Sequence, residues 1–331
     1  MSNPEINKFI ELTKIYGNDI FLIQGGGGNN SFKQNGKLFI KSSGSSFREA
    51  GRKNLSVLDI LSGGQIEEKG FSILKPSMES DFHLEIKSKF VFHMHCLRSI
   101  LITVIGKGDK LLKKLSSHNI YSIGLDYFTP GKDLASSIKN LNIESSEGLI
   151  LLKNHGVIVF SNDLSKIKKY LSLLEVLSTE LLNSNNYYFD SKLLEERCSN
   201  SKSFSLYKMP KDLDVFKLHN FKEYLFTPDQ VIYLNNKINW KPITLNSEND
   251  FLENDQVYFT HDNNLLLTSN NFILYEMVWG LIFMIRGLTK MQKDKSCHLL
   301  SKEEAQKLLR MPDEKYRKSF SSRNSHLDNK D

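Results

Sequence analysis

The sequence predicts a mixed α/β protein, because patterns typical of helices and of strands both occur along its 331 residues. Apolar residues recur with helical spacing in three segments, residues 4–16, 164–183 and 272–287. Short runs of apolar and β-branched residues, such as residues 149–152 and 157–160, are typical of strands. Asn35-Gly36 adds a strong signal for the turn of a hairpin. We therefore expect helices and strands to pack on each other throughout the chain.

The N-terminal half alternates between the two kinds of element. In the opening segment Ile6, Phe9 and Ile10 share one helical face, and Leu171 and Leu174 do so in the long later helix. The expected elements are, in order, a helix over residues 4–16, a strand over 20–24 that runs into four glycines, a hairpin over 31–40, a helix over 80–87, a strand over 89–96, paired strands over 149–152 and 157–160, and a helix over 164–183.

The C-terminal part is expected to form a smaller α/β unit. Polar stretches around residues 183–186 and 199–203 suggest a boundary near residue 195. This predicts two domains, residues 1–195 and residues 196–331. The elements expected after the boundary are strands over residues 230–234, 257–260 and 265–268, and helices over 272–287 and 301–310. No residue of this part stands out chemically.

Composition favours a soluble cytoplasmic protein. Apolar content is 40%, charged residues make up 25%, and the net charge of +6 is dispersed, which argues against a nucleic-acid partner. Cys96, Cys198 and Cys297 are odd in number and form no CxxC, so a reducing compartment is expected. No signal-peptide core precedes the opening helix. The apolar window 272–288 contains Glu276 and Arg286, so we expect no membrane span.

Two histidines stand out in the apolar run over residues 89–96. Side chains alternate faces along a strand, so Val91, His93 and His95 share one face, while Phe90, Phe92 and Met94 share the other. Burying two imidazoles side by side is costly unless something binds them, and neutral imidazole is the commonest metal ligand. A single strand histidine is usually an ordinary core residue, but the pair raises the prospect of a metal site.

Three further motifs can be combined with this pair. His155, at a turn between two strands, would complete a three-histidine site with an open fourth position, as in catalytic zinc sites, although a hairpin turn alone would also explain it. Glu79 begins a helix, where it is either a capping residue or a proton-transferring base beside a metal. Residues 25–28 are four glycines whose N–H groups could converge on an anion, or form a simple loop.

These motifs together resemble the class II aldolase/adducin family over about residues 5 to 183. The matching elements are Gln24-Gly25-Gly26-Gly27-Gly28-Asn29-Asn30-Ser31, Ile40-Lys41-Ser42-Ser43-Gly44, Pro76-Ser77-Met78-Glu79, His93-Met94-His95, Tyr127-Phe128-Thr129-Pro130-Gly131 and Asn154-His155-Gly156. Within the family, the sequence is most similar to the aldolase domain of bifunctional rhamnulose-phosphate aldolase/short-chain dehydrogenases. Those proteins also have C-terminal segments that resemble residues 227–233 and 314–317.

The resemblance implies a three-layer α/β/α fold with a mostly antiparallel central sheet, usually assembled as a tetramer. It also implies that His93, His95 and His155 hold a zinc ion, or another divalent transition metal, and that Glu79 is the acid/base. The residues implied at the substrate phosphate are Gly28, Asn29, Ser43, Gly44 and Ser77. Met78 stands where single-domain aldolases commonly have a second serine, which removes one hydroxyl from that phosphate site.

The activity that the resemblance implies is reversible cleavage of a ketose phosphate into dihydroxyacetone phosphate and an aldehyde. The same histidines also support epimerases, dehydratases and decarboxylases of phosphorylated sugars or sugar acids. A third alternative is a binding protein that kept the fold and lost the chemistry, as adducin heads have. Intact histidines and Glu79 argue against this last alternative. The identity of the sugar is not readable from the sequence.

Overall fold

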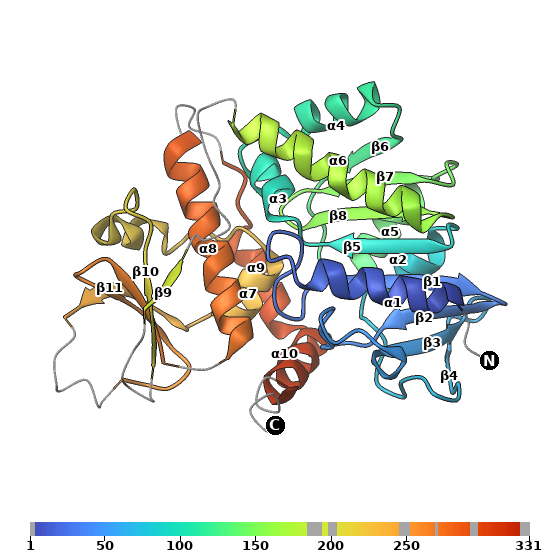
Figure 1. Ribbon diagram of the computed structural model, residues 1–331, viewed down its shortest axis with the longest axis horizontal. Coiled ribbons are helices and arrows are strands. Elements are labelled where there is room, and N and C mark those ends of the chain that lie inside the picture. The colour runs from blue at the N-terminus through green and yellow to red at the C-terminus, as the bar shows by residue number, and fades with distance from the viewer. Residues whose placement is uncertain are drawn as a thin grey trace.

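The computed structural model describes residues 4–183, 194–197, 204–244, 252–268, 271–291 and 297–324. Two sheets and ten α-helices lie within these ranges, so the α/β prediction is confirmed (Figure 1). The expected boundary, residue 195, lies in the short strand β9 (Glu195–Arg197), whereas most of the flanking stretches 183–186 and 199–203 lies outside the described residues. Two short 3-10 helices complete the described structure, η1 (Arg52–Asn54) and η2 (Val215–Phe221).

Eight strands form the N-terminal sheet in the order β4-β3-β2-β1-β5-β8-β7-β6. Only β6 and β7 pair in parallel, so the sheet is mostly antiparallel, as the resemblance implied. At Asn35 and Gly36 the backbone has positive φ, which gives the tight turn predicted between β1 and β2. The strands are β1 (Asn29–Gln34), β2 (Lys37–Lys41), β3 (Leu55–Asp59), β4 (Gln65–Ile66), β5 (Phe90–Met94), β6 (Ser122–Leu125), β7 (Gly148–Leu152) and β8 (Gly156–Ser161).

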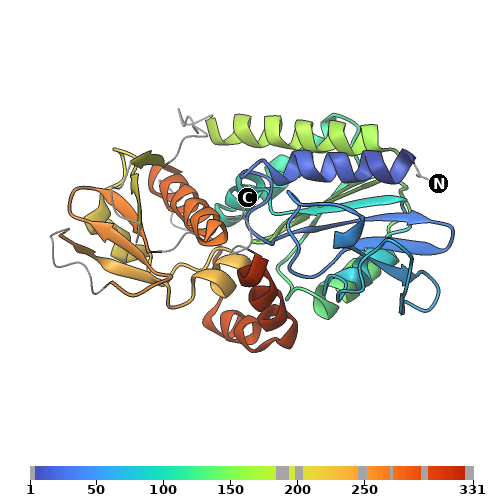
Figure 2. The same ribbon diagram turned by 60° about the horizontal axis from the view of Figure 1, so that its bottom comes forward.

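Helices cover both faces of this sheet and make the three layers (Figure 2). On β5, Phe92 and Met94 join the core cluster under α1, α3, α4 and α6, while Val91 joins the cluster under α2 and α5. The alternation predicted from the sequence therefore places His93 on the α2/α5 side. The helices are α1 (Pro4–Gly17), α2 (Ser80–Glu85), α3 (Leu97–Val104), α4 (Gly108–Ser117), α5 (Lys132–Asn140) and α6 (Leu164–Asn183).

The segment 20–24 was expected to be a strand, and this expectation is wrong. The chain turns there, and the N–H groups of Leu22 and Ile23 both donate to the Asp19 carbonyl. Its apolar side chains are needed for packing instead, because the Phe21 ring meets Trp279 and Phe283 edge-on at 5.0 and 5.6 Å. A short run of residues can therefore be apolar because it packs against distant elements, and not because it forms a strand.

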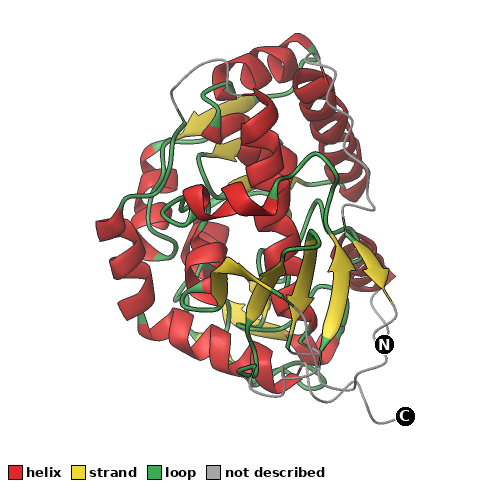
Figure 3. Cartoon of the chain, turned by 90° about the vertical axis from the view of Figure 1, so that its left-hand side faces the viewer, coloured by secondary structure: helices red, strands yellow, loops and turns green. Residues whose placement is uncertain are grey.

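The C-terminal region contains a five-stranded sheet and four helices (Figure 3). Its strands follow the order β11-β12-β13-β10-β9, and only β11 and β12 are parallel. The strands are β9 (Glu195–Arg197), β10 (Ser205–Lys208), β11 (Ile238–Ile243), β12 (Val257–Thr260) and β13 (Asn264–Leu267). The helices are α7 (Pro228–Leu234), α8 (Phe272–Met291), α9 (Lys302–Arg310) and α10 (Pro312–Asn324).

The segment 230–234 was also expected to be a strand, but it lies in helix α7. Thr227 caps this helix, because its hydroxyl accepts a hydrogen bond from the Gln230 N–H at 3.2 Å. Pro228 stands at the first helical position, where its missing N–H costs nothing. These helix-start signals outweigh the strand preference of Val231 and Ile232.

Helix α8 joins the two regions into one core. By length and composition alone it could cross a membrane, but 72% of its apolar window is buried inside the protein, so the expected absence of a membrane span stays a prediction. It packs on α3 so closely that a Cβ on Gly287 would collide with Leu101. Its side chains belong to the same hydrophobic cluster as those of α1 and α6. A continuous hydrophobic core therefore extends across the boundary expected between residues 1–195 and 196–331.

Candidate metal centre

Three histidines meet where β5 ends and where β7 turns into β8. His93 is paired with Ile158 on β8, and His95 follows directly after β5. The turn between β7 and β8 carries His155, with Asn154 in the left-handed region at φ 58°. Gly156 has φ 141°, and a Cβ there would collide with the Met94 carbonyl oxygen. Only glycine therefore lets this turn approach the end of β5 closely enough to bring His155 beside the pair.

The three Nε2 atoms point at one another. His93 Nε2 lies 3.1 Å from His95 Nε2 and 3.4 Å from His155 Nε2. All three side chains are buried, and the possible ligand atoms lie within 4.8 Å of one another. Burial, reinforced by the neighbouring imidazoles, lowers the pKa of His93 and of His155 well below the usual range. The neutral rings offer lone pairs, which is the form that binds a metal.

Hydrogen bonds on the other ring nitrogens support this arrangement. His93 Nδ1 is 3.2 Å from the Val157 carbonyl oxygen, so it carries the proton and leaves Nε2 as an acceptor. His95 Nδ1 lies 2.8 Å from Asp229 Oδ2, with the same consequence for its ring. The lone pairs of His93 and His95 that face each other across 3.1 Å repel unless a cation lies between them. The three histidines therefore fit a divalent metal.

Glu79 lies against the histidine cluster from the start of α2. Its Oε2 is 3.6 Å from His93 Nε2, and its Oε1 is 3.8 Å from His155 Nε2. Asn29 Nδ2 donates to Oε2 at 2.6 Å, whereas buried Oε1 accepts no hydrogen bond in the described part of the chain. Burial raises the pKa of Glu79 to about 7, against the lowering effects of His95 and Asn29. A carboxyl with this pKa can both take up and release a proton near neutral pH.

His83 belongs to the same group, although the sequence analysis did not single it out. Its Nε2 contacts Asn29 Oδ1, and its Nδ1 lies 2.8 Å from Ser31 Oγ. These contacts fix the Asn29 amide with its nitrogen toward Glu79. His83 is four residues after Glu79, a spacing that puts both on one face of a helix. That spacing was the available sequence signal.

The residues implied at the phosphate line a cavity of about 20 Å³ beside Glu79. These residues are Gly28, Asn29, Ser43, Gly44 and Ser77, and Met78 lines the cavity with them. Lys41 is also in its wall, and burial together with nearby Arg317 lowers the pKa of this lysine to about 7, although Asp229 and Glu79 oppose the effect.

Three N–H groups of the glycine run have partners inside the protein, so a role at an anion, which was predicted beside that of a simple loop, stays a prediction. Gly25 N–H donates to Glu276 Oε2 at 2.6 Å, so a carboxylate of the protein itself occupies this donor. Gly27 N–H donates to the Gln24 carbonyl oxygen, and Gly28 N–H to His95 Nε2 at 3.3 Å. Because its residues carry no side chains, the run lets the backbone pass close to His93 and His95.

Residues of the C-terminal region also reach the site, which corrects the expectation that none of them stands out. Asp229 on α7 contacts His95, and Arg317 on α10 donates to Asp229 Oδ1 at 2.6 Å and to Glu314 Oε2 at 2.7 Å. Burial alone would raise the pKa of Asp229, but Arg317 and His95 outweigh it and hold the pKa far below the usual range. All three residues lie in the segments 227–233 and 314–317 noted in the sequence.

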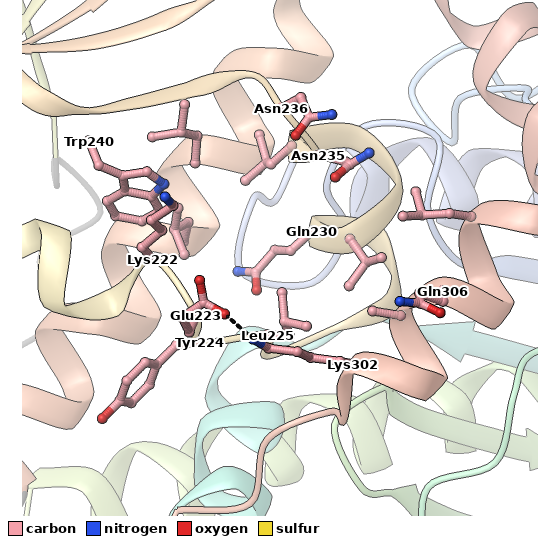
Figure 4. Close-up of a pocket in the computed structure, with 16 residues that line it drawn as sticks. Lys222, Glu223, Tyr224, Leu225, Gln230, Asn235, Asn236, Trp240, Lys302 and Gln306 are labelled. Carbon is pink, nitrogen blue, oxygen red and sulfur yellow. Dashed lines mark ion pairs between the residues drawn. The ribbon is translucent and has the colours of Figure 1, made fainter.

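A larger cavity of about 430 Å³, lined by none of the three histidines, lies beside α7 (Figure 4). Trp240, Leu225 and Leu234 give it apolar walls, and the side chain of Gln230 points into it. The ion pair between Lys302 and Glu223 lies at its edge, with 2.7 Å between the charged atoms. Among the described residues, the three-histidine cluster adjoins the smaller cavity, whose wall includes His155 and Glu79, and not this one.

Comparison with known families agrees with this geometry. The sequence model of the class II aldolase and adducin N-terminal domain matches residues 10–181. The chain belongs to the class II aldolase and adducin family. A class II aldolase relative, named L-fuculose phosphate aldolase in Methanocaldococcus jannaschii, is 31% identical over 180 residues, covering 52% of this chain and 91% of the relative.

Two solved structures of the class II aldolase fold align with the same part of the chain. The N-terminal class II aldolase domain of a Thermoplasma acidophilum protein is 21% identical, with 55% of this chain and 95% of that chain covered and a TM-score of 0.46. A sugar-phosphate aldolase from Thermotoga maritima is 17% identical, with 56% and 96% covered and a TM-score of 0.47.

Proposed function

We propose that this protein is a metal-dependent aldolase, with zinc as the metal, that cleaves a ketose phosphate to dihydroxyacetone phosphate and an aldehyde. The observation that carries the proposal is the position of Glu79, 3.6 and 3.8 Å from two of three converging imidazoles. The similarity to a relative named L-fuculose phosphate aldolase supports a sugar-phosphate substrate.

In this proposal each side chain has a defined task. His93, His95 and His155 hold the metal, which when bound supplies a Lewis acid that polarises the substrate carbonyl. Cleavage breaks the bond between the carbon next to that carbonyl and the carbinol carbon. The carbinol hydroxyl gives its proton to solvent, and its carbon becomes the aldehyde carbon. Glu79 delivers a proton to the carbon left behind, and removes it in the reverse direction. Asn29 holds the carboxyl in place through Oε2.

The test is aldehyde release by purified, zinc-loaded protein from a panel of phosphorylated ketoses and their unphosphorylated counterparts. We expect release from at least one phosphorylated ketose and loss of about 10²-fold or more of it in Glu79→Gln, because general acid–base catalysis contributes that much. The variant should keep its metal and its thermal stability. Metal-loaded protein that consumes a sugar phosphate without releasing an aldehyde would instead indicate an epimerase, dehydratase or decarboxylase.

A further inference from the structure

We propose that the C-terminal region completes this site within the same chain: Asp229 orients His95 toward the metal, and Arg317 binds the anionic group of the substrate. This inference rests on the proposed function. It adds two positioning and specificity-determining residues that lie beyond the matched family domain, which ends at residue 181.

The contact between Asp229 and His95 has the geometry of a carboxylate that orients a metal ligand. Their atoms are 2.8 Å apart, and both side chains are almost fully buried. Such a contact fixes which ring nitrogen carries the proton and which way the ring faces. The backbone makes room for it, because a Cβ on Gly27 would collide with Asp229 Oδ2 and lie 2.7 Å from His95 Nδ1.

The C-terminal region also holds the turn that carries His155. Asn154 Nδ2 donates to the carbonyl oxygen of Phe226 at 3.0 Å and to that of His298 at 2.9 Å. Phe226 directly precedes the cap of α7, so the same short segment fixes the positions of two of the three histidines. The C-terminal region therefore contacts the metal ligands from two directions.

Arg317 has donors left over for a ligand. Its Nε and Nη2 are used by Glu314 and Asp229, while Nη1 makes no hydrogen bond within the described residues. The side chain is 12% exposed and lines the cavity with Ser43 and Ser77. A guanidinium fixed by two carboxylates presents its remaining N–H groups in one direction, which suits the oxygens of a phosphate.

Binding a phosphate requires α10 to move. A cavity of about 20 Å³ holds roughly one water molecule. Helix α10 closes it from outside, since a Cβ on Gly44 would lie 2.9 Å from Phe320 Cβ and 3.2 Å from the Arg317 carbonyl oxygen. Entry of the anion therefore requires an outward shift of α10, the helix that carries Arg317.

The first arm of the test measures metal affinity by competition with a chelator, which does not depend on activity. Asp229→Asn keeps an acceptor for His95 but loses the charge, so we expect affinity to fall by about tenfold, and by up to about a hundredfold in Asp229→Ala. Asp126→Asn, a change at an exposed side chain, is the control and should match the parent. Should the alanine variant fail to fold, the asparagine variant carries the test. Unchanged affinity in a folded variant overturns the role of Asp229.

The second arm measures binding of inorganic phosphate to metal-loaded protein by calorimetry. We expect Arg317→Gln to weaken binding by at least about tenfold, since a hydrogen bond to a charged group contributes about 1.5–3 kcal/mol. Arg317→Lys should fall between the parent and Arg317→Gln. Lys315→Gln removes the same charge from an exposed position on α10 and should change binding less than twofold.

The outcomes separate this inference from the proposed function. Phosphate binding that is unchanged or tighter in Arg317→Gln overturns the role of Arg317, while the metal and the aldolase activity can still stand. A parent protein that binds neither metal nor phosphate overturns the proposed function itself. Weaker phosphate binding with full metal content supports the inference, because a purely structural arginine would not affect the anion alone.

Discussion

At the scale of single residues, the site depends on side chains that hold other side chains. Glu79 is fixed by Asn29, and Asn29 is fixed by His83, which in turn contacts Ser31. Burial lowers the pKa of His83 well below its usual range, so the ring is neutral and has one donor and one acceptor nitrogen. The Glu79 carboxyl is therefore at the end of a chain of hydrogen bonds that begins on β1.

His83→Gln should reduce turnover without releasing the metal. The shorter reach of the glutamine amide leaves Asn29 less firmly held, so we expect kcat to fall by about tenfold to a hundredfold while metal content and KM stay close to those of the parent. His118→Gln, at an exposed histidine, is the control. Loss of metal with unchanged kcat per bound metal would contradict the role given to His83.

Lys41 makes a second prediction at this scale, through the pH dependence of stability. Its pKa of about 7 in the folded protein lies below the ordinary pKa of a lysine, 10.5. Between these values the unfolded chain holds a proton that the folded protein lacks, so stability rises with pH across this window. At pH 7 and below the buried charge has its full destabilising effect. Lys41→Met removes this effect.

The expected result is a higher Tm for Lys41→Met at pH 7, by about 2 °C or more, and a gain that shrinks as the pH approaches 10.5. Loss of the contacts from Nζ to the Gly26 and Ser45 carbonyl oxygens offsets part of the gain, so the trend with pH is the informative quantity. Lys37→Met, at the other end of β2, is the control. A gain that stays constant from pH 7 to 10.5 would contradict burial as the cause.

At the scale of elements, the glycine run lets the backbone pass close to the side chains of the site. Its backbone lies so close to His95 and Asp229 that Gly27 cannot carry a side chain without displacing them. The run also receives Glu276 from α8 and Lys41 from β2, through Gly25 N–H and the Gly26 carbonyl oxygen. This loop therefore connects His95 to two distant elements, α8 and β2.

Gly27→Ala should therefore weaken metal binding by about tenfold or more, because the new methyl separates Asp229 from His95. Gly51→Ala is a matched control, since its Cβ would meet its nearest neighbour at an ordinary 3.5 Å. Chelator competition measures both. Equal metal affinity in the two variants would show that the loop shifts to accommodate the new methyl group without displacing His95.

Local patterns predicted most elements of the fold, and their failures share a cause. The hairpin at Asn35-Gly36 depends on two neighbouring residues that tolerate positive φ, so the sequence alone predicts it. The runs at 20–24 and 230–234 are apolar because α8 and α9 pack on them, and no local pattern contains those partners. The histidine motif could be recognised in the sequence. The contacts of Asp229 and Arg317 could not, since they join residues 134 and 88 positions apart.

At the scale of the whole molecule, one hydrophobic core runs through both regions. Helix α8 is apolar almost all round, which is typical of a helix enclosed by other elements. The rings of Trp279 and Phe283 on α8 contact Phe21 in the N-terminal region. The family match covers residues 10–181. Part of the surface of this region is apolar, and α8, which lies outside the match, covers it.

A fragment ending at residue 183 is therefore expected to be poorly soluble or to self-associate, because Phe21, Leu97 and Leu101 lose their cover. Gel filtration and the soluble fraction on expression measure this against the full chain. A monomeric, folded fragment that binds metal as tightly as the full chain would support the two independent domains suggested by the sequence, and would remove any need for Asp229.

The order of the residues along the chain has a consequence for how the metal arrives. All three histidines have been synthesised once residue 155 is added, whereas Arg317 follows about 160 residues later. Translation at about 5–20 residues per second makes this interval roughly 10–30 s. During that time the imidazoles are present while α7 and α10, which enclose them, do not yet exist. In the proposed site a metal can therefore reach the imidazoles before the completed chain encloses them.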